Sequence, residues 1–323
     1  MIDHELLARE LVRALRGSRS QAAFNRRFKF KTNVVSSWER GTRYPTAARF
    51  LGVAEALGVD VRARLRAFLH EQAGQIQSDT PLERVVLGLL EELRGTSTVV
   101  SIAARMGKHR IAVARWLKGQ TEPRLPEFLA LVDALCPRLA DFVGVFCDPA
   151  QIPSLAVAWR DLVAQRRIAF DEPWSHALLR ALELDRHEQL AEHEPGLLGR
   201  AVGLSEAEEE RLMAQLCACR QVTRVDGRWV NCRVMAVDTG GRSTDAERLK
   251  RHWAGVALDR FAAGRLGDGL FSFNLFVVSD EDYEQIRQLH LRYFNELRSI
   301  VQNSKKNDRV VLVNQQLVPL AEI

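Results

Sequence analysis

The sequence of 323 residues predicts a mainly α-helical protein. We expect two tandem five-helix domains, then a winged helix, then a small α/β unit at the end of the chain. Three observations lead to this prediction. Apolar residues recur at helical spacing over most of the chain, one block of sequence recurs in a second copy, and the last part alternates helical segments with strand-like apolar runs.

The composition indicates a folded protein without a membrane-spanning segment. Hydrophobic residues make up 46% of the chain, and no apolar run approaches the roughly 18 residues that cross a bilayer. The first residues, MIDHELLARELVRALRG, carry acids and lack the regions of a signal peptide, so we expect a cytoplasmic protein. The five cysteines are odd in number and irregularly spaced, which implies no disulfide framework. Cys217 and Cys219 point apart on a predicted helix, which favours packing over a metal or redox pair, and we expect no cofactor.

The net charge of +5 is concentrated at the N-terminal end. Residues 1–80 hold 14 Lys and Arg against 8 Asp and Glu, whereas residues 149–323 hold 23 against 25. A basic N-terminal region is expected where that region meets an anionic partner. The excess is modest, so the charge identifies nucleic acid only together with a motif.

The first domain is predicted over residues 1–70. ELLARELVRALRG forms an amphipathic helix that ends at Gly17, and SQAAFNRRF forms a second helix with Ser20 as its N-cap. After the turn KFK, TNVVSSWERG forms a third helix, and TAARFLGVAEALG forms another that ends at Gly58. The polar stretch HEQAGQIQSDTP then predicts a linker.

The second domain, over residues 80–148, repeats this scheme. PLERVVLGLLEELRG, STVVSIAARMG and HRIAVARWLKG are successive helices, and LPEFLALVDALCPRLADFVGVF is a helical pair after the turn QTEP. Two copies are too few for a solenoid, so they indicate two related domains in tandem.

Residues 149–240 are predicted as a helical segment followed by a winged helix. The winged helix has a short helix after Gly196, a longer helix from Ser205 with acids in its first turns, and a hairpin. The hairpin joins Val222–Val225 to Trp229–Val230 through an Asp-Gly turn, which is the strongest short-range hairpin signal.

Residues 241–323 are predicted as a small α/β unit with a regulatory or dimerisation role. Two helices, over 246–263 and 280–303, alternate with the apolar runs LFSFNLFVVS and DRVVLVNQQLVPL. Both runs are rich in β-branched and aromatic residues, which predicts strands.

The segment from Ser20 to Pro45 meets the requirements of a helix pair that reads DNA. Phe24 and Trp38 would anchor its two helices, and Phe30 would close the turn between them. Outward residues of the second helix would reach base edges in the major groove, with cations beside them on phosphates. The base-reading candidates are Thr32, Asn33, Ser36 and Ser37. The phosphate candidates beside them are Lys31, Arg40 and Arg43.

This segment resembles the Cro/Xre-type helix-turn-helix family of phage and bacterial repressors. The match runs without a gap from SQ through WERG to the following proline and the VAEALGV helix. The resemblance implies that Gln21 contacts a phosphate and that Thr32, Asn33 and Ser37 read bases. The family usually has glycine where this chain has Lys29, and a left-handed backbone there would cost a lysine about 1 kcal/mol, which predicts a reshaped turn. The alternative is a helical bundle that binds no DNA.

The segment SIAARMGKHRIAVARWLKGQTEP aligns with the first motif without a gap, and Gly107 takes the turn position of Lys29. Its outward residues differ. The base-reading candidates are Arg110, Ile111 and Arg115. The phosphate candidates are Lys108, His109 and Lys118. Arginine is the commonest reader of guanine, whereas an exposed Ile111 in a nearly neutral domain fits a thymine methyl or protein contact. DNA contact and packing by a degenerate copy therefore both stay open.

Residues 155–320 resemble a poorly characterised C-terminal domain of bacterial helix-turn-helix regulators. The DGRW wing and the terminal run ending in VPL carry most of this resemblance, which implies a transcriptional regulator without naming a ligand. The acidic second helix of the winged helix would repel phosphate, so we expect it to be structural or dimer-forming.

The sequence gives little support to an enzyme. His187 and His193 in HEQLAEHE are six residues apart, whereas a zinc-protease helix needs four, and GRLGDG lacks the strand and helix of a dinucleotide site. We therefore expect a sequence-specific transcriptional regulator, in the first place a repressor, that binds double-stranded DNA as a homodimer and takes a small-molecule or protein effector at its C-terminal domain. The alternative is an antitoxin-like or phage-control module whose C-terminal domain binds a protein partner.

Overall fold

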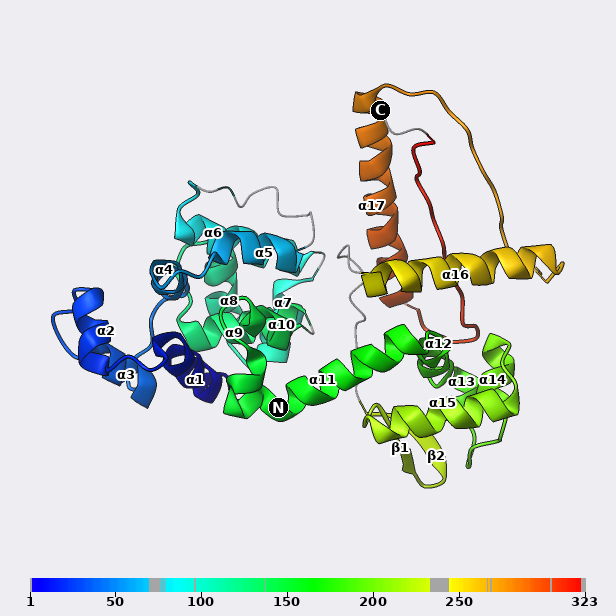
Figure 1. Ribbon diagram of the computed structural model, residues 1–323, viewed down its shortest axis with the longest axis horizontal. Helices are drawn as coiled ribbons and strands as arrows, with labels where there is room; N and C mark the ends of the chain where they lie inside the picture. Colours follow the sequence, from blue (N-terminus) through cyan, green and yellow to red (C-terminus); the bar gives the residue numbers. More distant parts are fainter. Residues whose placement is uncertain are drawn as a thin grey trace. The chain divides into compact units, whose positions relative to one another are not determined.

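The computed structural model describes residues 2–69, 77, 79–95, 97–136, 138–232, 244–265, 267, 269–302 and 304–320. Over these residues the chain is mainly α-helical, as predicted, with one two-stranded antiparallel sheet (Figure 1). The chain divides into two compact units, Met1–Ala164 and Gln165–Ile323. No helix in the described part of the chain is long and apolar enough to cross a membrane.

The first repeat forms five helices. Their bounds are α1 His4–Arg16, α2 Gln21–Arg27, α3 Val34–Arg40, α4 Ala47–Ala56 and α5 Val61–Leu69. Asp3, Ser20 and Thr46 precede three of these helices, and each side chain accepts a hydrogen bond from a backbone N–H of the first turn. The predicted N-cap at Ser20 is confirmed.

The second repeat also forms five helices. Their bounds are α6 Leu82–Arg94, α7 Val99–Met106, α8 Arg110–Leu117, α9 Leu125–Leu135 and α10 Leu139–Gly144. A 3₁₀ helix, Pro149–Gln151, leads into α11, Pro153–Asp171. Most of the linker predicted between residues 70 and 80 lies outside the described residues.

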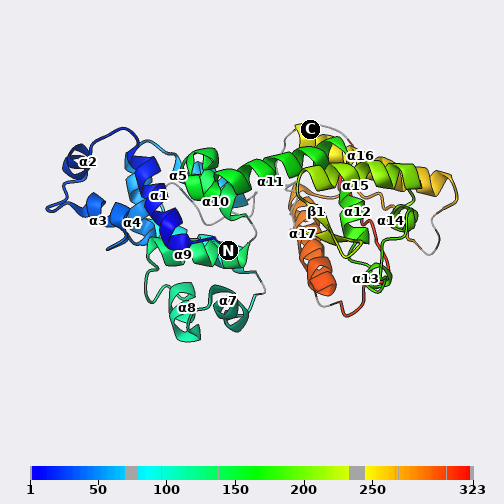
Figure 2. The same cartoon turned by 90° about the horizontal axis from the view of Figure 1, so that it is seen from below.

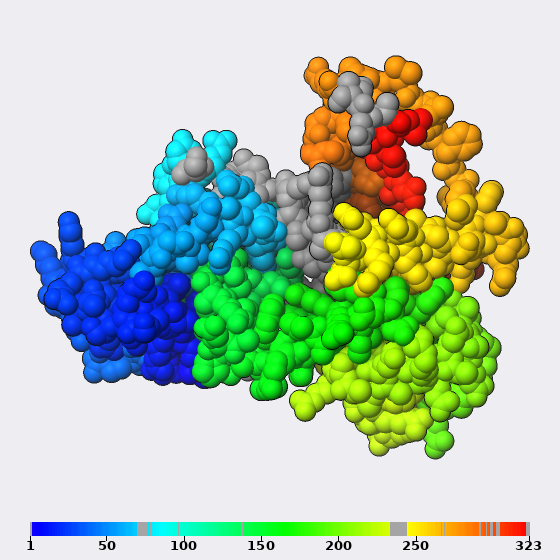
Figure 3. All heavy atoms as spheres, viewed as in Figure 1, coloured from blue at the N-terminus to red at the C-terminus, as the bar shows by residue number. Residues whose placement is uncertain are grey.

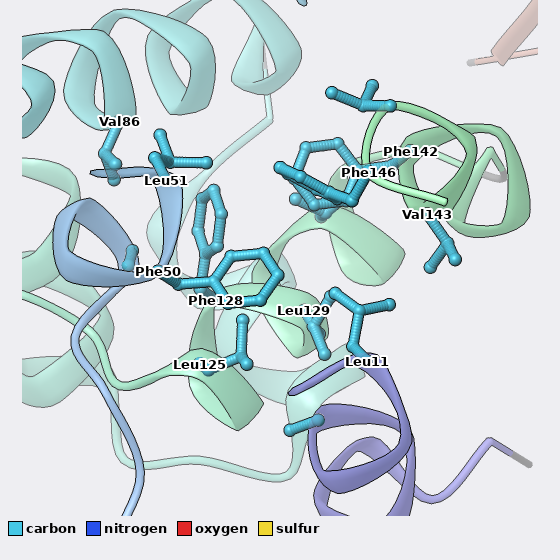
Figure 4. Packing of buried hydrophobic residues seen from close by; sticks show 14 of the residues in the cluster. Leu11, Phe50, Leu51, Val86, Leu125, Phe128, Leu129, Phe142, Val143 and Phe146 are labelled. Atoms are coloured by element: carbon cyan, nitrogen blue, oxygen red, sulfur yellow. The ribbon is translucent and has the colours of Figure 1, made fainter. Parts of the chain in front are cut away.

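A single hydrophobic core extends through both repeats. Phe50 and Leu51 of α4 lie in the same cluster as Phe128 of α9 and Phe142 of α10 (Figure 4). The ring centroids of Phe50 and Phe146 are 4.9 Å apart, and those of Phe128 and Phe142 are 5.5 Å apart. The two five-helix regions therefore lie in one compact unit.

The second unit begins with short helices and a hairpin around a core of its own. Their bounds are α12 Trp174–Ala181, α13 Asp185–Glu188, α14 Leu197–Val202, α15 Glu206–Ala218, β1 Val222–Val225 and β2 Arg228–Asn231. The predicted hairpin is confirmed, because β1 pairs antiparallel with β2 and the turn residues Asp226 and Gly227 both have positive φ. Leu178 of α12 and Leu216 of α15 are fully buried in this core.

Two longer helices follow, α16 Thr244–Ala262 and α17 Asp280–Gln302, close to the predicted ranges. The predicted small α/β unit is wrong, because the structure has no strand over residues 270–279 or 305–319 (Figure 1). A strand needs a neighbouring backbone, and no backbone hydrogen bond joins residues 270–278 to another described residue. These apolar runs are instead open coil.

Candidate nucleic-acid interface

Aromatic side chains hold the turn between α2 and α3. Successive ring centroids are 4.7 Å apart from Phe24 to Phe28, 5.8 Å from Phe28 to Phe30 and 5.4 Å from Phe30 to Trp38. Phe30 thus packs inward, as predicted. The predicted reshaping of this turn is wrong, because Lys29 takes the left-handed conformation itself, with φ +51°. The packed rings on both sides keep the backbone in that conformation despite its cost for a lysine.

The predicted base-reading side chains lie together at α3. Thr32 and Asn33 are exposed just before the helix, and Ser36 and Ser37 are half-buried in its first two turns. Asn33 caps the helix, since its Oδ1 accepts hydrogen bonds from the Ser36 backbone N–H at 3.3 Å and from Asn25 Nδ2 at 2.8 Å. Bidentate recognition of adenine by Asn33 would therefore require this cap to open.

Three of the predicted phosphate contacts flank α3. Lys31 is exposed before the helix, and Arg40 and Arg43 are exposed at and after its end. The Arg40 Nε donates to the Ser36 carbonyl at 3.3 Å, which lays the side chain along the helix. Gly41, with φ +78°, ends the helix and turns the chain toward Arg43.

Gln21, the fourth predicted phosphate contact, has its side-chain amide engaged inside the protein. Its Nε2 donates to Glu39 Oε2 at 2.7 Å, and Glu39 also accepts from the Arg16 Nε. The Arg13 guanidinium donates to the Glu39 carbonyl at 3.0 Å, and the Glu39 side chain is buried. Glu39 therefore ties α1, α2 and α3 together and sets the position of α3. This role was not predicted from the sequence, although an acid directly after the inward-facing Trp38 indicates a buried polar contact.

The second predicted set lies together at α8 and is more basic. Arg110, Ile111 and Arg115 are exposed on the helix, and Lys108, His109 and Lys118 are exposed at its ends. The His109 Nδ1 accepts from the Ile111 backbone N–H at 3.4 Å, so this histidine caps α8 as Asn33 caps α3. Gly107 ends α7 with φ +60°, the conformation of Lys29 in the first copy. Figure 2 shows α3 and α8 at separate edges of the first unit, with α1, α4 and α9 between them.

The second unit places an acidic helix before its hairpin. Ser205 and Glu208 form a capping box at the start of α15, and Glu206 and Glu210 are exposed. Glu209 is buried and pairs with His193 at 3.0 Å. Burial lowers the pKa of His193, while the Glu209 carboxylate acts in the opposite direction. The exposed carboxylates make this helix unsuited to a phosphate backbone.

A cavity of about 490 Å³ lies in the second unit beside α12 and α16. Trp174 and Trp253 line it edge to face, with ring centroids 5.3 Å apart, and Arg180 and Arg260 also line it. Burial, together with the Arg180 charge, lowers the pKa of the lining His176 to about 4, so that histidine is neutral at pH 7. The lining thus combines aromatic walls with arginine side chains.

The chain after α16 carries an exposed apolar surface, called here the C-terminal apolar surface. It consists of Leu270, Phe271, Phe273, Leu275, Phe276, Val277, Leu289, Ile300, Val301, Val311, Val318 and Leu320. Phe273 is 91% exposed and Leu270 96% exposed. The segment before residue 320, red in Figure 3, is visible on the face of the molecule shown there. On soluble monomers the largest exposed apolar patch is usually about 300–600 Å².

Comparison with known proteins identifies a family for the second part of the chain. Neither a curated protein nor a solved structure matches this chain. A family model described as a domain of unknown function (DUF4423) matches residues 156–320, the part that contains the acidic helix, the cavity and the C-terminal apolar surface. The match spans more than half of the 323 residues, and the chain therefore belongs to the DUF4423 family.

Proposed function

We propose that the protein is a sequence-specific DNA-binding transcriptional regulator that reads the major groove with α3. The observation behind this proposal is the arrangement at that helix. Buried Val35 and Trp38 fix one side of α3, while exposed polar and basic side chains occupy the other side and both ends. This arrangement suits a helix of a helix-turn-helix that lies in a groove with its cations on the flanking phosphates.

The side chains at α3 divide into two roles. Thr32, Asn33 and Ser37 reach base edges, while Arg40 and Arg43 neutralise phosphates and orient the helix. Glu39 contacts no DNA and holds α3 in place from behind. We expect the protein to act as a repressor, because a protein bound to its operator blocks polymerase sterically.

A gel-shift experiment on the protein's own promoter region tests the proposal. Arg43→Ala should weaken binding to all duplexes alike and reduce the salt slope by about one. Asn33→Ser keeps a capping side chain but removes the amide, so it should weaken the specific duplex by about tenfold and leave non-specific duplexes unchanged.

The matched control is Arg167→Ala, which removes another exposed arginine, one that lies on α11. It should leave binding unchanged. If Asn33→Ser and Arg43→Ala both bind like the unaltered protein, α3 does not read DNA and the proposal is wrong.

A second copy of the chain is the proposed occupant of the C-terminal apolar surface. No backbone hydrogen bond joins residues 270–278 to another described residue, so their backbone groups are available to a strand of another copy. The charges of α17 also favour a copy of itself, because the helix begins with Asp280, Glu281 and Asp282 and is followed by Lys305 and Lys306. Two antiparallel α17 helices would place these acids beside the partner's lysines.

Sedimentation of the full chain tests this dimer. Phe273→Ser combined with Val277→Ser should convert a dimer into a monomer, whereas Val157→Ser, a substitution of an exposed valine on α11, should not. A monomeric unaltered chain would contradict the dimer, and a stoichiometric foreign protein on this surface would favour the antitoxin-like alternative.

The cavity beside α12 and α16 is the proposed effector site. Its aromatic walls and arginines suit a small molecule with a flat apolar body and a carboxylate. Indole-3-carboxylate should raise the melting temperature of the full chain, and Arg260→Gln should abolish the increase. An unchanged melting temperature with this probe and with phenylpyruvate would count against the site.

A further inference from the structure

The two repeats contact each other through a reciprocal pair of backbone hydrogen bonds. The Ala47 N–H donates to the Pro123 carbonyl at 3.0 Å, and the Leu125 N–H donates to the Pro45 carbonyl at 2.9 Å. Thr46 and Arg124 form the antiparallel bridge between them. Equivalent residues of the two repeats are 78 positions apart, as Lys29 and Gly107 are. Pro45 and Ala47 therefore correspond to Pro123 and Leu125, and each of the two hydrogen bonds is the counterpart of the other.

The same exchange recurs at the level of helices and side chains. The first helix of the first repeat, α1, packs on the fourth helix of the second, α9, and α6 packs on α4 in the same way. Phe68 and Phe142 have ring centroids 5.6 Å apart. Arg64 is the equivalent of Phe142, and its guanidinium donates to the Val145 carbonyl, which lies beside Phe146, the equivalent of Phe68.

Reciprocal contacts identify the kind of symmetry between the repeats. When residue i of one copy meets residue j of another and j meets i, the copies are related by a two-fold axis, whereas tandem stacking gives one-way contacts. The first unit therefore contains a local two-fold axis near Thr46 and Arg124, and it relates α3 to α8. A single chain has the internal arrangement of a symmetric pair of subunits.

We propose that one chain reads two inverted and unlike half-sites of a single DNA site, one with α3 and one with α8. This inference rests on the proposed function in DNA binding. The backbone of duplex DNA has two-fold axes perpendicular to its length, so a two-fold pair of reading helices fits two inverted half-sites at once. The half-sites are expected about 10 base pairs apart, as for other paired reading helices.

The two half-sites differ because the outward residues of the repeats differ. Thr32, Asn33 and Ser37 offer short hydrogen-bonding groups, and Asn33 suits adenine once its amide oxygen leaves the cap of α3. The equivalent residues of the second repeat are Arg110, Ile111 and Arg115, two of them long cations that suit guanine and one an apolar side chain that suits a thymine methyl. One half-site should therefore contain essential guanines and the other an essential adenine.

Selection from random duplexes with the full chain, followed by fluorescence anisotropy, tests the inference. The selected site should contain two unlike halves in inverted orientation. Reversing one half in place, so that the halves become a direct repeat, should weaken binding by about 100-fold, since only one helix can then engage.

Paired variants assign the halves. Arg115→Ala should weaken binding by about tenfold and relax the base preference only in the guanine-containing half, and Ser37→Ala should relax it only in the other half. Both residues lie on the outward side of their helices, and unchanged melting temperatures would confirm that the variants fold. Arg167→Ala serves again as the charge control.

The outcomes separate this inference from the proposed function. A chain that binds every duplex alike would overturn DNA recognition itself. Three results from a chain with a clear sequence preference would overturn the two-fold reading and leave the role of α3 intact. These are unchanged binding after reversal of one half, selection of identical halves, and a preference that lies wholly in the half read by α3.

Discussion

At the scale of single residues, Lys29 and Gly107 show how one backbone position constrains the chain. They are equivalent in the two repeats and have φ +51° and +60°. A glycine adopts this conformation freely, while a side chain there costs roughly 1–2 kcal/mol. The first repeat tolerates the cost because its aromatic turn is packed on both sides.

Substitutions at these positions should have opposite effects on stability. Gly107→Ala should lower the free energy of unfolding by about 1 kcal/mol, and Lys29→Gly should raise it by less than that. A Cβ at Gly107 would meet no atom within 4 Å, so the loss would come from the backbone alone. Urea titration measures both effects, and equal stability of Gly107→Ala and the unaltered chain would contradict the argument.

His176 should make the second unit sensitive to mild acid. Burial first, and the Arg180 charge second, lower its pKa from the ordinary 6.5 to about 4 in the folded protein. The unfolded chain therefore binds a proton more readily, so this contribution to stability is present above pH 6.5 and is lost as the pH falls toward 4. Between pH 7 and pH 5 the loss should be about 2 kcal/mol.

Urea titration at both pH values measures this loss. In His176→Gln, which has no ionisable group at this position, the decrease between pH 7 and pH 5 should be smaller by most of that amount. An unchanged decrease would show that other groups are responsible.

At the scale of elements, different side-chain contacts hold the equivalent helix pairs of the two repeats in place. In the first repeat the half-buried Arg16 and Gln21 form a polar network around the buried Glu39. In the second repeat Val99 and Leu117 replace Gln21 and Glu39, and the Leu117 side chain is buried. The equivalent of Arg16 there is Arg94, whose Nε donates to the Ser97 carbonyl instead.

This difference predicts the effect of removing the network. Glu39→Ala should lower the free energy of unfolding by about 3 kcal/mol, because it leaves Arg16 and Gln21 without their acceptor. The double variant Gln21→Val with Glu39→Leu copies the second repeat and should recover most of that loss. Thermal unfolding measures both variants, and a double variant no more stable than Glu39→Ala would contradict this account.

The same comparison explains which elements could be predicted from sequence. The cap at Ser20 and the hairpin at Asp226 and Gly227 depend on neighbouring residues, so local patterns revealed them. The role of Glu39 depends on partners in two other helices, which no local pattern reports. The strand predicted over 270–279 was wrong because β-branched and aromatic residues report a preference for strand but do not supply a pairing backbone.

At the scale of the whole molecule, the two units have separate cores and should unfold separately. The polar stretch after α5 suggested a linker between two related domains in tandem. The packing of α4 on α6 places both repeats around one core, a contact between distant segments that composition does not report. The candidate residues were easier to locate from the sequence, because they lie on α3 and α8 or directly beside the ends of these two helices, whose periodicity is clear; their role in binding DNA stays a prediction.

Three substitutions at fully buried leucines test this division. Leu51→Ala and Leu129→Ala lie in different repeats but in one core, and Leu216→Ala lies in the other unit. Each should cost about 2–5 kcal/mol. Calorimetry should show the first two lowering the same transition and the third lowering a different one. Separate transitions for Leu51→Ala and Leu129→Ala would contradict a shared core.

The reciprocal bridge between Thr46 and Arg124 also affects how binding depends on protein concentration. In a regulator built from two identical subunits, dilution separates the two reading helices, and any mutation appears in both. Here both helices belong to one polypeptide, so their pairing survives any dilution and each can change its base preference alone. Such a chain would keep binding an operator whose two halves diverge in sequence, because each reading helix would adapt to its own half.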